Sequence, residues 1–172
     1  MKNKITENKA FFNKLAKNYD DLFGNYIKKM QLKLINHVNI KNNSNVLDVG
    51  CGTGNFLKIL EDSNKNLNLY GIDISEKMLK IAKNKLKNTK LFINQAEKIN
   101  SKEKFDYIFT TDAFHHLSNR EMFVKKSYKA LKKQGTIIIA DLSFGKFLNY
   151  IFSKIEPGNT GILSPEQIKQ LL

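Results

Sequence analysis

Apolar and polar positions along the chain follow two kinds of spacing. Five short apolar runs predict β-strands, and the stretches between them carry apolar residues every three or four positions, as amphipathic helices do. The predicted strands are 46–50, 67–72, 91–93, 107–111 and 136–141. The helices predicted between them are 55–61, 76–86 and 119–132. Strands that alternate with helices are typical of a mainly parallel sheet with helices on both faces.

The two ends of the chain add helices to this core. The first 40 residues predict two helices that divide at Gly24-Asn25, and the C-terminal residues predict helices at 144–155 and from Ser164-Pro165 onward. A length of 172 residues suits one domain. We therefore expect a single domain over 1–172, with a helical cap at 1–40, a ligand-binding core at 44–141 and a helical tail at 142–172.

Three glycines at alternate positions, Gly50, Gly52 and Gly54, follow the first predicted strand. Glycine lets the backbone turn sharply and lets a ligand approach the main chain where a Cβ atom would collide. The N–H groups that begin the following helix favour electron-rich ligand atoms. A dinucleotide site would place its third glycine at position 55, which is Asn55, so the spacing disfavours a pyrophosphate ligand.

An acidic residue stands at the end of the second predicted strand. Asp73 lies nineteen residues after Gly54, where a carboxylate can accept hydrogen bonds from both hydroxyl groups of a ribose. A ribose-binding acid beside a loop that does not suit pyrophosphate predicts a nucleoside ligand without a long phosphate chain.

The segments around these residues resemble two motifs of the class I S-adenosylmethionine-dependent methyltransferases, in the branch that acts on small molecules. Residues 47–54, Leu-Asp-Val-Gly-Cys-Gly-Thr-Gly, are similar to the first motif, and residues 70–79 are similar to the second. The similarity extends over residues 11–141 and 163–172. The resemblance implies an α/β fold, a three-layer Rossmann-like sandwich with about five strands in the order 3-2-1-4-5, and S-adenosyl-L-methionine as the cofactor.

The resemblance also implies a set of cofactor-binding residues. Besides the ribose-binding acid, Ile74 and Met78 would flank the adenine, and Asp48 would help to hold the methionyl ammonium group. Tyr19 would cover the cofactor. Gln95 replaces an acid that the family commonly carries beside the adenine amino group, and its amide oxygen can still accept a hydrogen bond. The complete expected set is Tyr19, Asp48, Gly50, Cys51, Gly52, Gly54, Asp73, Ile74, Met78, Gln95, Ala96 and Thr111.

Two adjacent histidines are the candidates for catalysis. His115 and His116 follow the fourth predicted strand, on the side where the substrate is expected. An imidazole there could accept a proton from a hydroxyl group, an amine or an acidic carbon as the methyl group transfers. Adjacent residues cannot both face one pocket. The third histidine, His37, lies in a helical stretch and is expected to be structural.

The charge of the chain invites a nucleic-acid partner, but its composition argues against one. The formal net charge is +13, yet 28 of the 29 basic residues are Lys and only Arg120 is Arg, whereas proteins that read nucleic acids use Arg heavily. Lys, Asn and Ile all have A/T-rich codons, so the base composition of a genome explains the excess. We therefore do not expect nucleic acid as a partner.

Several classes of methyl acceptor are disfavoured. The fourth strand leads into Thr111-Asp-Ala-Phe rather than the Asn/Asp-Pro-Pro-Tyr/Phe motif of adenine-amino methylation, and no Pro-Cys nucleophile is present. The single cysteine, Cys51, offers neither an internal disulfide nor a cysteine-based metal site, which agrees with a reducing compartment. The sequence thus predicts methyl transfer to a small molecule on O, N or C, without a metal.

The rest of the chain bears on location and assembly. No apolar run approaches the roughly 18–20 residues that cross a bilayer, and no signal-peptide core follows the charged N-terminus, so we expect a cytoplasmic protein. The family's sixth and seventh strands are not found in residues 142–172. We therefore expect a chain shortened at its C-terminus, with an exposed sheet edge at 137–140 through which a homodimer could form.

Three other functions stay open. A non-catalytic module that binds S-adenosylmethionine is consistent with Gln95 and with the missing strands. Methylation of RNA is encouraged only by the charge. A nucleotide-dependent oxidoreductase that uses NAD is disfavoured by the glycine spacing.

Overall fold

The computed structural model describes residues 2–63, 65–141, 159 and 161–172. Its centre is a sheet of five parallel strands in the order β3-β2-β1-β4-β5. The strands are β1 (Asn45–Val49), β2 (Asn68–Asp73), β3 (Lys90–Ile93), β4 (Phe105–Thr111) and β5 (Leu131–Ala140). The predicted fold class and strand order are confirmed.

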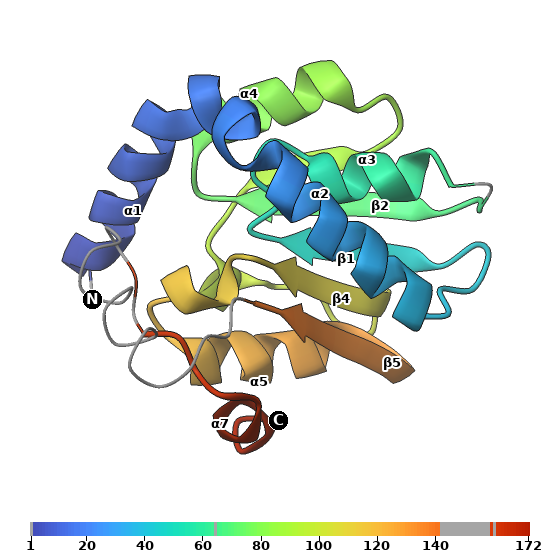
Figure 1. Ribbon diagram of the computed structural model, residues 1–172. Coiled ribbons are helices and arrows are strands. Elements are labelled where there is room, and N and C mark those ends of the chain that lie inside the picture. The colour runs from blue at the N-terminus through green and yellow to red at the C-terminus, as the bar shows by residue number, and fades with distance from the viewer. Residues whose placement is uncertain (1, 64, 142–158, 160) are drawn as a thin grey trace.

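Helices cover both faces of this sheet (Figure 1). One face carries α2 (Tyr19–His37), α3 (Asn55–Glu61) and α4 (Glu76–Lys85), and the other carries α5 (Arg120–Ala130) with the short helices η2 (Ala96–Lys98) and η3 (Phe114–His116). In the part of the chain that the structure describes, the remaining helices are α1 (Lys2–Leu15), η1 (Ala16–Asn18) and α7 (Pro165–Lys169). The helix predicted at 144–155 lies outside the described residues.

The central strand β1 supplies both hydrophobic cores. Val46 packs into the core under α3 and α4, while its neighbour Leu47 packs into the core against α5. Successive side chains of a strand point to opposite faces, so a strand covered on both sides is mainly apolar. Phe56 and Phe109 meet in the first core with ring centroids 4.8 Å apart, and Phe123 is fully buried in the second. The loop that follows β1, which carries Gly50, Gly52 and Gly54, is therefore attached to a strand packed on both faces.

The N-terminal helices divide at a different place from the prediction. The sequence predicts a break at Gly24-Asn25, but the chain bends at Ala16–Asn18 and Gly24 lies inside α2. One glycine in a helix interior costs about 1 kcal/mol, which the burial of Ile27 on the same helix offsets. Asp20 and Asp21 in the first turn favour a helix start there, because acids stabilise the positive end of the helix dipole.

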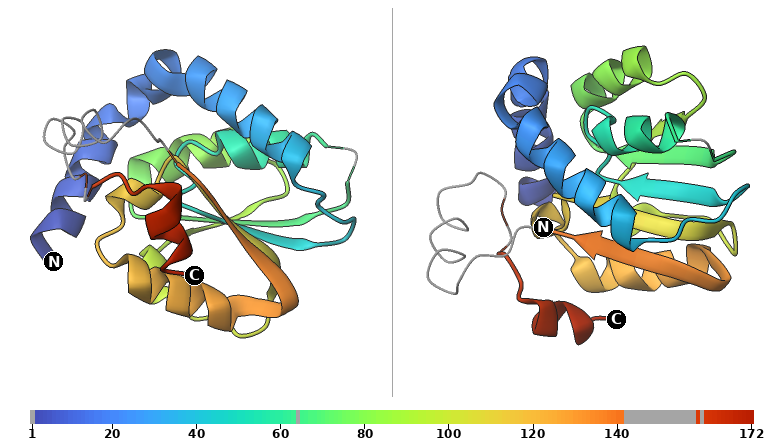
Figure 2. Two further views of the ribbon diagram at one scale, coloured as in Figure 1. Left: turned by 60° about the horizontal axis from the view of Figure 1, so that its bottom comes forward. Right: turned by 45° about the vertical axis from the view of Figure 1, so that its right-hand side comes forward.

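Helix α1 crosses the carboxyl ends of the strands and contacts α4 through polar side chains (Figures 1 and 2). Lys9 forms an ion pair with Glu76 at 2.6 Å. The Asn13 side-chain oxygen accepts hydrogen bonds from the Ser75 hydroxyl at 2.8 Å and the Lys77 amide at 3.2 Å. Ser75 is also the N-cap of α4, since its hydroxyl accepts from the Met78 amide at 3.1 Å. Helix α1, part of the N-terminal helical cap, is thus attached to the start of α4.

The fifth strand begins earlier than predicted. The sequence predicts a helix to Lys132 and a strand from Thr136, but α5 ends at Ala130 and β5 starts at Leu131, which pairs with Phe105. A register shift follows in the ladder, and Gln134 takes a left-handed φ of 68°. Within the described residues β5 is an edge strand, and the expected homodimer through this edge stays a prediction. In the described part of the chain no helix has the length and apolar character needed to span a membrane.

Candidate functional site

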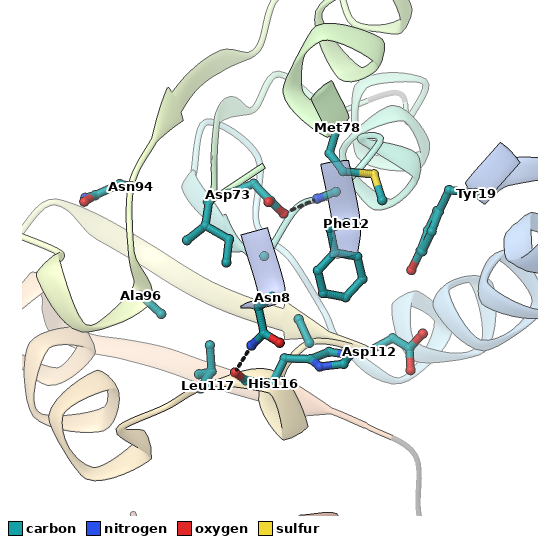
Figure 3. Close-up of a pocket in the computed structure, with 14 residues that line it drawn as sticks. Asn8, Phe12, Tyr19, Asp73, Met78, Asn94, Ala96, Asp112, His116 and Leu117 are labelled. Atoms are coloured by element: carbon teal, nitrogen blue, oxygen red, sulfur yellow. Dashed lines mark hydrogen bonds between the residues drawn. The ribbon is translucent and has the colours of Figure 1, made fainter. Parts of the chain in front are cut away.

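A pocket opens at the carboxyl ends of the central strands, below helix α1 (Figure 3). Most of the residues that the sequence singled out as ligand contacts meet there. These are Tyr19, Gly50, Gly52, Asp73, Ile74, Met78, Ala96 and His116. Other lining residues were not predicted to contact a ligand: Asn8, Phe12, Asn94, Asp112, Ala113 and Leu117.

Six predicted site residues do not line this pocket. Cys51 and Thr111 line a smaller neighbouring cavity, which shares Tyr19, Gly50, Gly52 and Asp112 with the first. Asp48, Gly54, Gln95 and His115 line neither cavity. At Gly54 the reason is packing, because a Cβ atom would come within 2.9 Å of Leu86 and 3.1 Å of Ala82. The structure therefore gives this glycine a role between helices α3 and α4.

The glycine loop presents bare main chain to the pocket at one position. Gly50 and Gly52 both have positive φ angles, of 74° and 52°. A Cβ atom on Gly50 would lie 2.6 Å from the Ala113 Cβ, so this glycine allows the loop to pack on the segment after β4. A Cβ atom on Gly52 would meet no protein atom within 4 Å, so the missing side chain leaves open space at the pocket. A ligand can approach the backbone there.

Asp73 joins the glycine loop to the end of β2. Its carboxylate accepts hydrogen bonds from the Gly52 amide at 2.9 Å and from the Ser75 amide at 2.8 Å. Burial raises the pKa of Asp73, and the backbone amides of Ser75, Gly52 and Ile74 oppose that rise. A carboxylate has about four acceptor positions. Asp73 can therefore hold the loop and still accept hydrogen bonds from two ligand hydroxyl groups.

Asp48 lies behind the pocket, on β1. Its side chain is buried, and its Oδ1 atom has no hydrogen-bond partner among the described residues. Burial, and then the nearby charge of Asp73, raise the pKa of Asp48 to about 8. The group is therefore protonated at neutral pH when no cation is near. A ligand cation close to this acid would favour its ionised form.

A polar cluster fastens the cap to the glycine loop. Asp20 accepts hydrogen bonds from the Thr53 hydroxyl at 2.6 Å and from the Asn55 side-chain Nδ2 at 2.9 Å, and it forms an ion pair with Lys85 at 2.9 Å. Burial opposes ionisation of Asp20, but these three donors outweigh it and lower its pKa. Tyr19 precedes this acid, so the cluster also places the tyrosine beside the pocket.

The two histidines have different surroundings. His116 lines the pocket, and its ring meets Phe12 edge-on with centroids 4.9 Å apart. His115 is buried behind it, where Nδ1 lies 2.6 Å from the Asp141 carboxylate and the His115 amide donates to the same carboxylate at 2.7 Å. Only His116 is in a position to contact a ligand in this pocket.

The single arginine of the chain holds the histidine segment in place. Arg120 donates from Nε to the Phe114 carbonyl oxygen at 3.1 Å and from Nη2 to the His115 carbonyl oxygen at 3.2 Å. It also donates to the Gly161 carbonyl oxygen. A guanidinium group can make such divergent bonds from one plane, which the single ammonium of Lys cannot reproduce. The sequence marks Arg120 as the single arginine, but no pattern around it indicated a role in holding the histidine segment.

Three side chains near this segment have the composition of a metal site. Ligand atoms of Asp112, His115 and Asp141 lie within 4.8 Å of one another. Both Asp141 oxygens already accept hydrogen bonds from His115, one from its ring and one from its amide. The cluster is explained by this pairing, and we assign no metal to it.

The raised pKa of Asp48 predicts a pH dependence of stability. The folded carboxyl group keeps its proton up to about pH 8, whereas in the unfolded chain it loses it near pH 4, so its contribution to stability falls as the pH rises between these values. Asp48→Asn removes this titration. We expect urea unfolding to show a variant whose stability relative to the parent increases from pH 4 to pH 8. The exposed Asp62→Asn variant is the control, and the same trend in both would contradict the assignment.

Comparisons with known proteins agree with this geometry. Residues 40–169 match the model of a methyltransferase domain family. The phosphoethanolamine N-methyltransferase of Plasmodium falciparum is 32% identical over 146 residues, which cover 78% of this chain and 54% of that protein. The chain spans 54–59% of the length of the first three curated relatives that it matches.

Solved structures share the fold. A chain from the complex of the Haloferax volcanii methyltransferase activator Trm112 with a methyltransferase superimposes with a TM-score of 0.84 at 16% identity, over 93% of this chain and 73% of that one. Phosphoethanolamine N-methyltransferase 2 of Haemonchus contortus, solved with S-adenosyl-L-methionine, gives a TM-score of 0.68 at 22% identity over 83% and 35%. The glycine loop, the acid at the end of β2 and the family match over most of the chain together show that it belongs to the class I methyltransferase family.

Proposed function

We propose that this protein binds S-adenosyl-L-methionine and transfers its methyl group to a small-molecule acceptor. One observation carries the proposal: a single pocket unites the open main chain at Gly52, the carboxylate of Asp73 and the imidazole of His116. The family to which the chain belongs, and the S-adenosylmethionine complex of a structural neighbour, support it.

The described residues fit this cofactor. Asp73 has acceptor positions left for the ribose hydroxyl groups, and the open space at Gly52 admits a ligand against the backbone. Ile74 and Met78 give the apolar wall that an adenine ring needs. The Oδ1 atom of Asp48, which has no hydrogen-bond partner among the described residues, suits a nearby positive charge. The cofactor supplies an activated methyl group on a positively charged sulfur.

The protein's own part in the reaction is alignment and proton transfer. Methyl transfer depends mainly on holding the two reactants in line and on excluding water. Helix α1 covers the pocket with Asn8 and Phe12, which restricts the entry of water. His116 lies at the pocket wall, where it can accept a proton from the acceptor. Cys51 takes no part in proton transfer, because burial raises the pKa of its thiol well above the ordinary value.

Several expectations from the sequence stay predictions. Contacts of Cys51, Gln95 and Thr111 with the cofactor stay predictions. A cytoplasmic location and a homodimer stay predictions as well. A non-catalytic binding module remains the main alternative function. It would bind the cofactor without any turnover, so binding and turnover must be measured separately.

The ribose assignment is tested with Asp73→Ala. The variant loses two charge-assisted hydrogen bonds to the ligand, so we expect the Kd of S-adenosylhomocysteine to rise roughly 10- to 150-fold, about 1.4–3 kcal/mol. Isothermal titration calorimetry measures the Kd, and circular dichroism checks the fold. Asp62→Ala, an exposed acid remote from the pocket, should bind like the parent. An unchanged Kd in Asp73→Ala would contradict the assignment.

The role of His116 is tested with His116→Gln. The amide keeps much of the size of the ring but cannot accept the proton, so we expect kcat to fall about 100-fold with any acceptor that supports turnover. The Kd of S-adenosylhomocysteine should change little. His37→Gln is the matched control, because His37 lies at the end of α2, away from the pocket. Full activity in His116→Gln would show that His116 does not accept the proton.

The positioning role of Arg120 is tested with Arg120→Lys. The substitution keeps the charge and loses the divergent hydrogen bonds to the histidine segment. We expect kcat to fall about tenfold while the Kd of S-adenosylhomocysteine stays within about twofold, because the cofactor contacts lie on other elements. Lys125→Arg on the exposed side of the same helix is the control. Parallel losses in kcat and cofactor affinity would indicate a general structural role instead.

A further inference from the structure

The wall of the pocket beside His116 presents a hydrogen-bond acceptor without a partner. The Asn8 side-chain nitrogen donates to the His116 carbonyl oxygen at 2.9 Å. That bond fixes the orientation of the amide, because a carbonyl oxygen can only accept, so the Asn8 oxygen is the atom left for the pocket. Asn8 is 2% exposed, and its oxygen has no partner among the described residues. A buried acceptor of this kind favours a ligand that donates a hydrogen bond.

A carboxylate lies on the same wall. Asp112 follows β4, lines the pocket and has a left-handed φ of 53°, with its amide bonded to the Ala140 carbonyl oxygen at 2.8 Å. The pKa of Tyr26 is raised, first by burial and then by the charges of Asp112 and Asp141. The charge of Asp112 therefore acts on a neighbouring side chain, that of Tyr26.

Among the described residues, the lining of the pocket carries none of the positive charge that dominates the composition of the chain. The formal net charge of the protein is +13, but no Lys or Arg is among the described residues that line the pocket. His116 is the one basic side chain in that set. A carboxylate or phosphate in this pocket would lose hydration and find no ammonium or guanidinium group among those residues. Electrostatics therefore disfavour an anionic acceptor group beside His116.

Asn8 and Asp112 are not among the predicted cofactor contacts. Asp73 and Asp48, which suit the ribose and the positive charge of the cofactor, belong to the ends of β1 and β2. Asn8 and Asp112 come from α1 and from the segment after β4, and they lie with His116 along the opposite side of the pocket (Figure 3). That side is the one left for the methyl acceptor.

We propose that Asn8 and Asp112 determine specificity, by selecting a methyl acceptor that enters as an amine rather than as a carboxylate or phosphate. The inference rests on the proposed function. The Asn8 oxygen accepts an N–H hydrogen bond from the ammonium group, and Asp112 balances its charge. Both contacts hold the nitrogen beside His116.

The chemistry of an amine acceptor balances with the groups present. His116 takes one proton from the ammonium group, which frees the lone pair of the nitrogen. That lone pair forms the new N–C bond as the C–S bond breaks and its electron pair goes to sulfur. The products are a methylated ammonium ion, the neutral thioether and a protonated His116, which returns its proton to water.

The test uses matched probes on the full chain saturated with S-adenosylhomocysteine. Benzylamine is compared with benzoate, and phenethylamine with phenylacetate, because each pair shares a ring and differs in the charge of its head group. Isothermal titration calorimetry gives the Kd of each probe. We expect each amine to bind at least about tenfold more tightly than its acid.

Variants assign this preference to the two residues. Asp112→Asn keeps the left-handed backbone, which Asn tolerates, and should reduce the amine-to-acid ratio of affinities by about tenfold. Asn8→Leu removes the unpaired oxygen and should weaken amine binding by a similar factor. Asp62→Asn is the control for Asp112→Asn and should leave the ratio unchanged. Binding of S-adenosylhomocysteine to every variant shows that the pocket is intact.

The outcomes separate this inference from the proposed function. Failure of the parent protein to bind S-adenosylhomocysteine overturns both. If the parent binds it but binds acids as well as amines, or binds no amine, the acceptor inference fails and the proposed function stands. An amine preference that survives Asp112→Asn and Asn8→Leu overturns the roles of those two residues.

Discussion

The hydrogen bond from the Gly52 amide to the Asp73 carboxylate, at 2.9 Å, is the interaction on which the site depends. It joins the loop after β1 to the end of β2. Parallel pairing of these strands brings the two segments together, and the amides of Gly50 and Cys51 extend that pairing by donating to the Ile72 carbonyl oxygen. Because both strands are buried, their ends are rigid, and a ligand meets a preformed combination of bare backbone and acid.

Other elements close the pocket through polar contacts rather than through apolar packing alone. Asp20 attaches α2 to the glycine loop, Asn13 attaches α1 to α4, and Asn8 attaches α1 to the histidine segment. Arg120 holds that segment from the opposite side. These bonds define where the N-terminal helices α1 and α2 lie on the core.

The net charge of the chain does not describe the charge of the pocket. The lysine excess is spread along the chain, whereas the polar side chains among the described residues that line the pocket are acids, amides, a tyrosine and a histidine, with no Lys or Arg. The net charge therefore says little about the ligand. Burial changes the state of the acids as well, since Asp48 becomes neutral near pH 7 while Asp20, with three donors, ionises more readily. The chemistry of the site follows from position, not from composition.

Local sequence determined the existence of the five strands, the glycine loop and the place of Asp73 at the end of β2, because each depends on neighbours within a few residues or on the apolar run of one strand. Tertiary structure decided the rest. Gly24 lies inside α2 because burial outweighs its propensity, and only His116 of the two histidines reaches the pocket because Asp141 and Arg120 fix the turn that carries them. Asn8 and Asp112 line one pocket with His116 although they lie about a hundred residues apart in the chain, a separation over which no local pattern carries information.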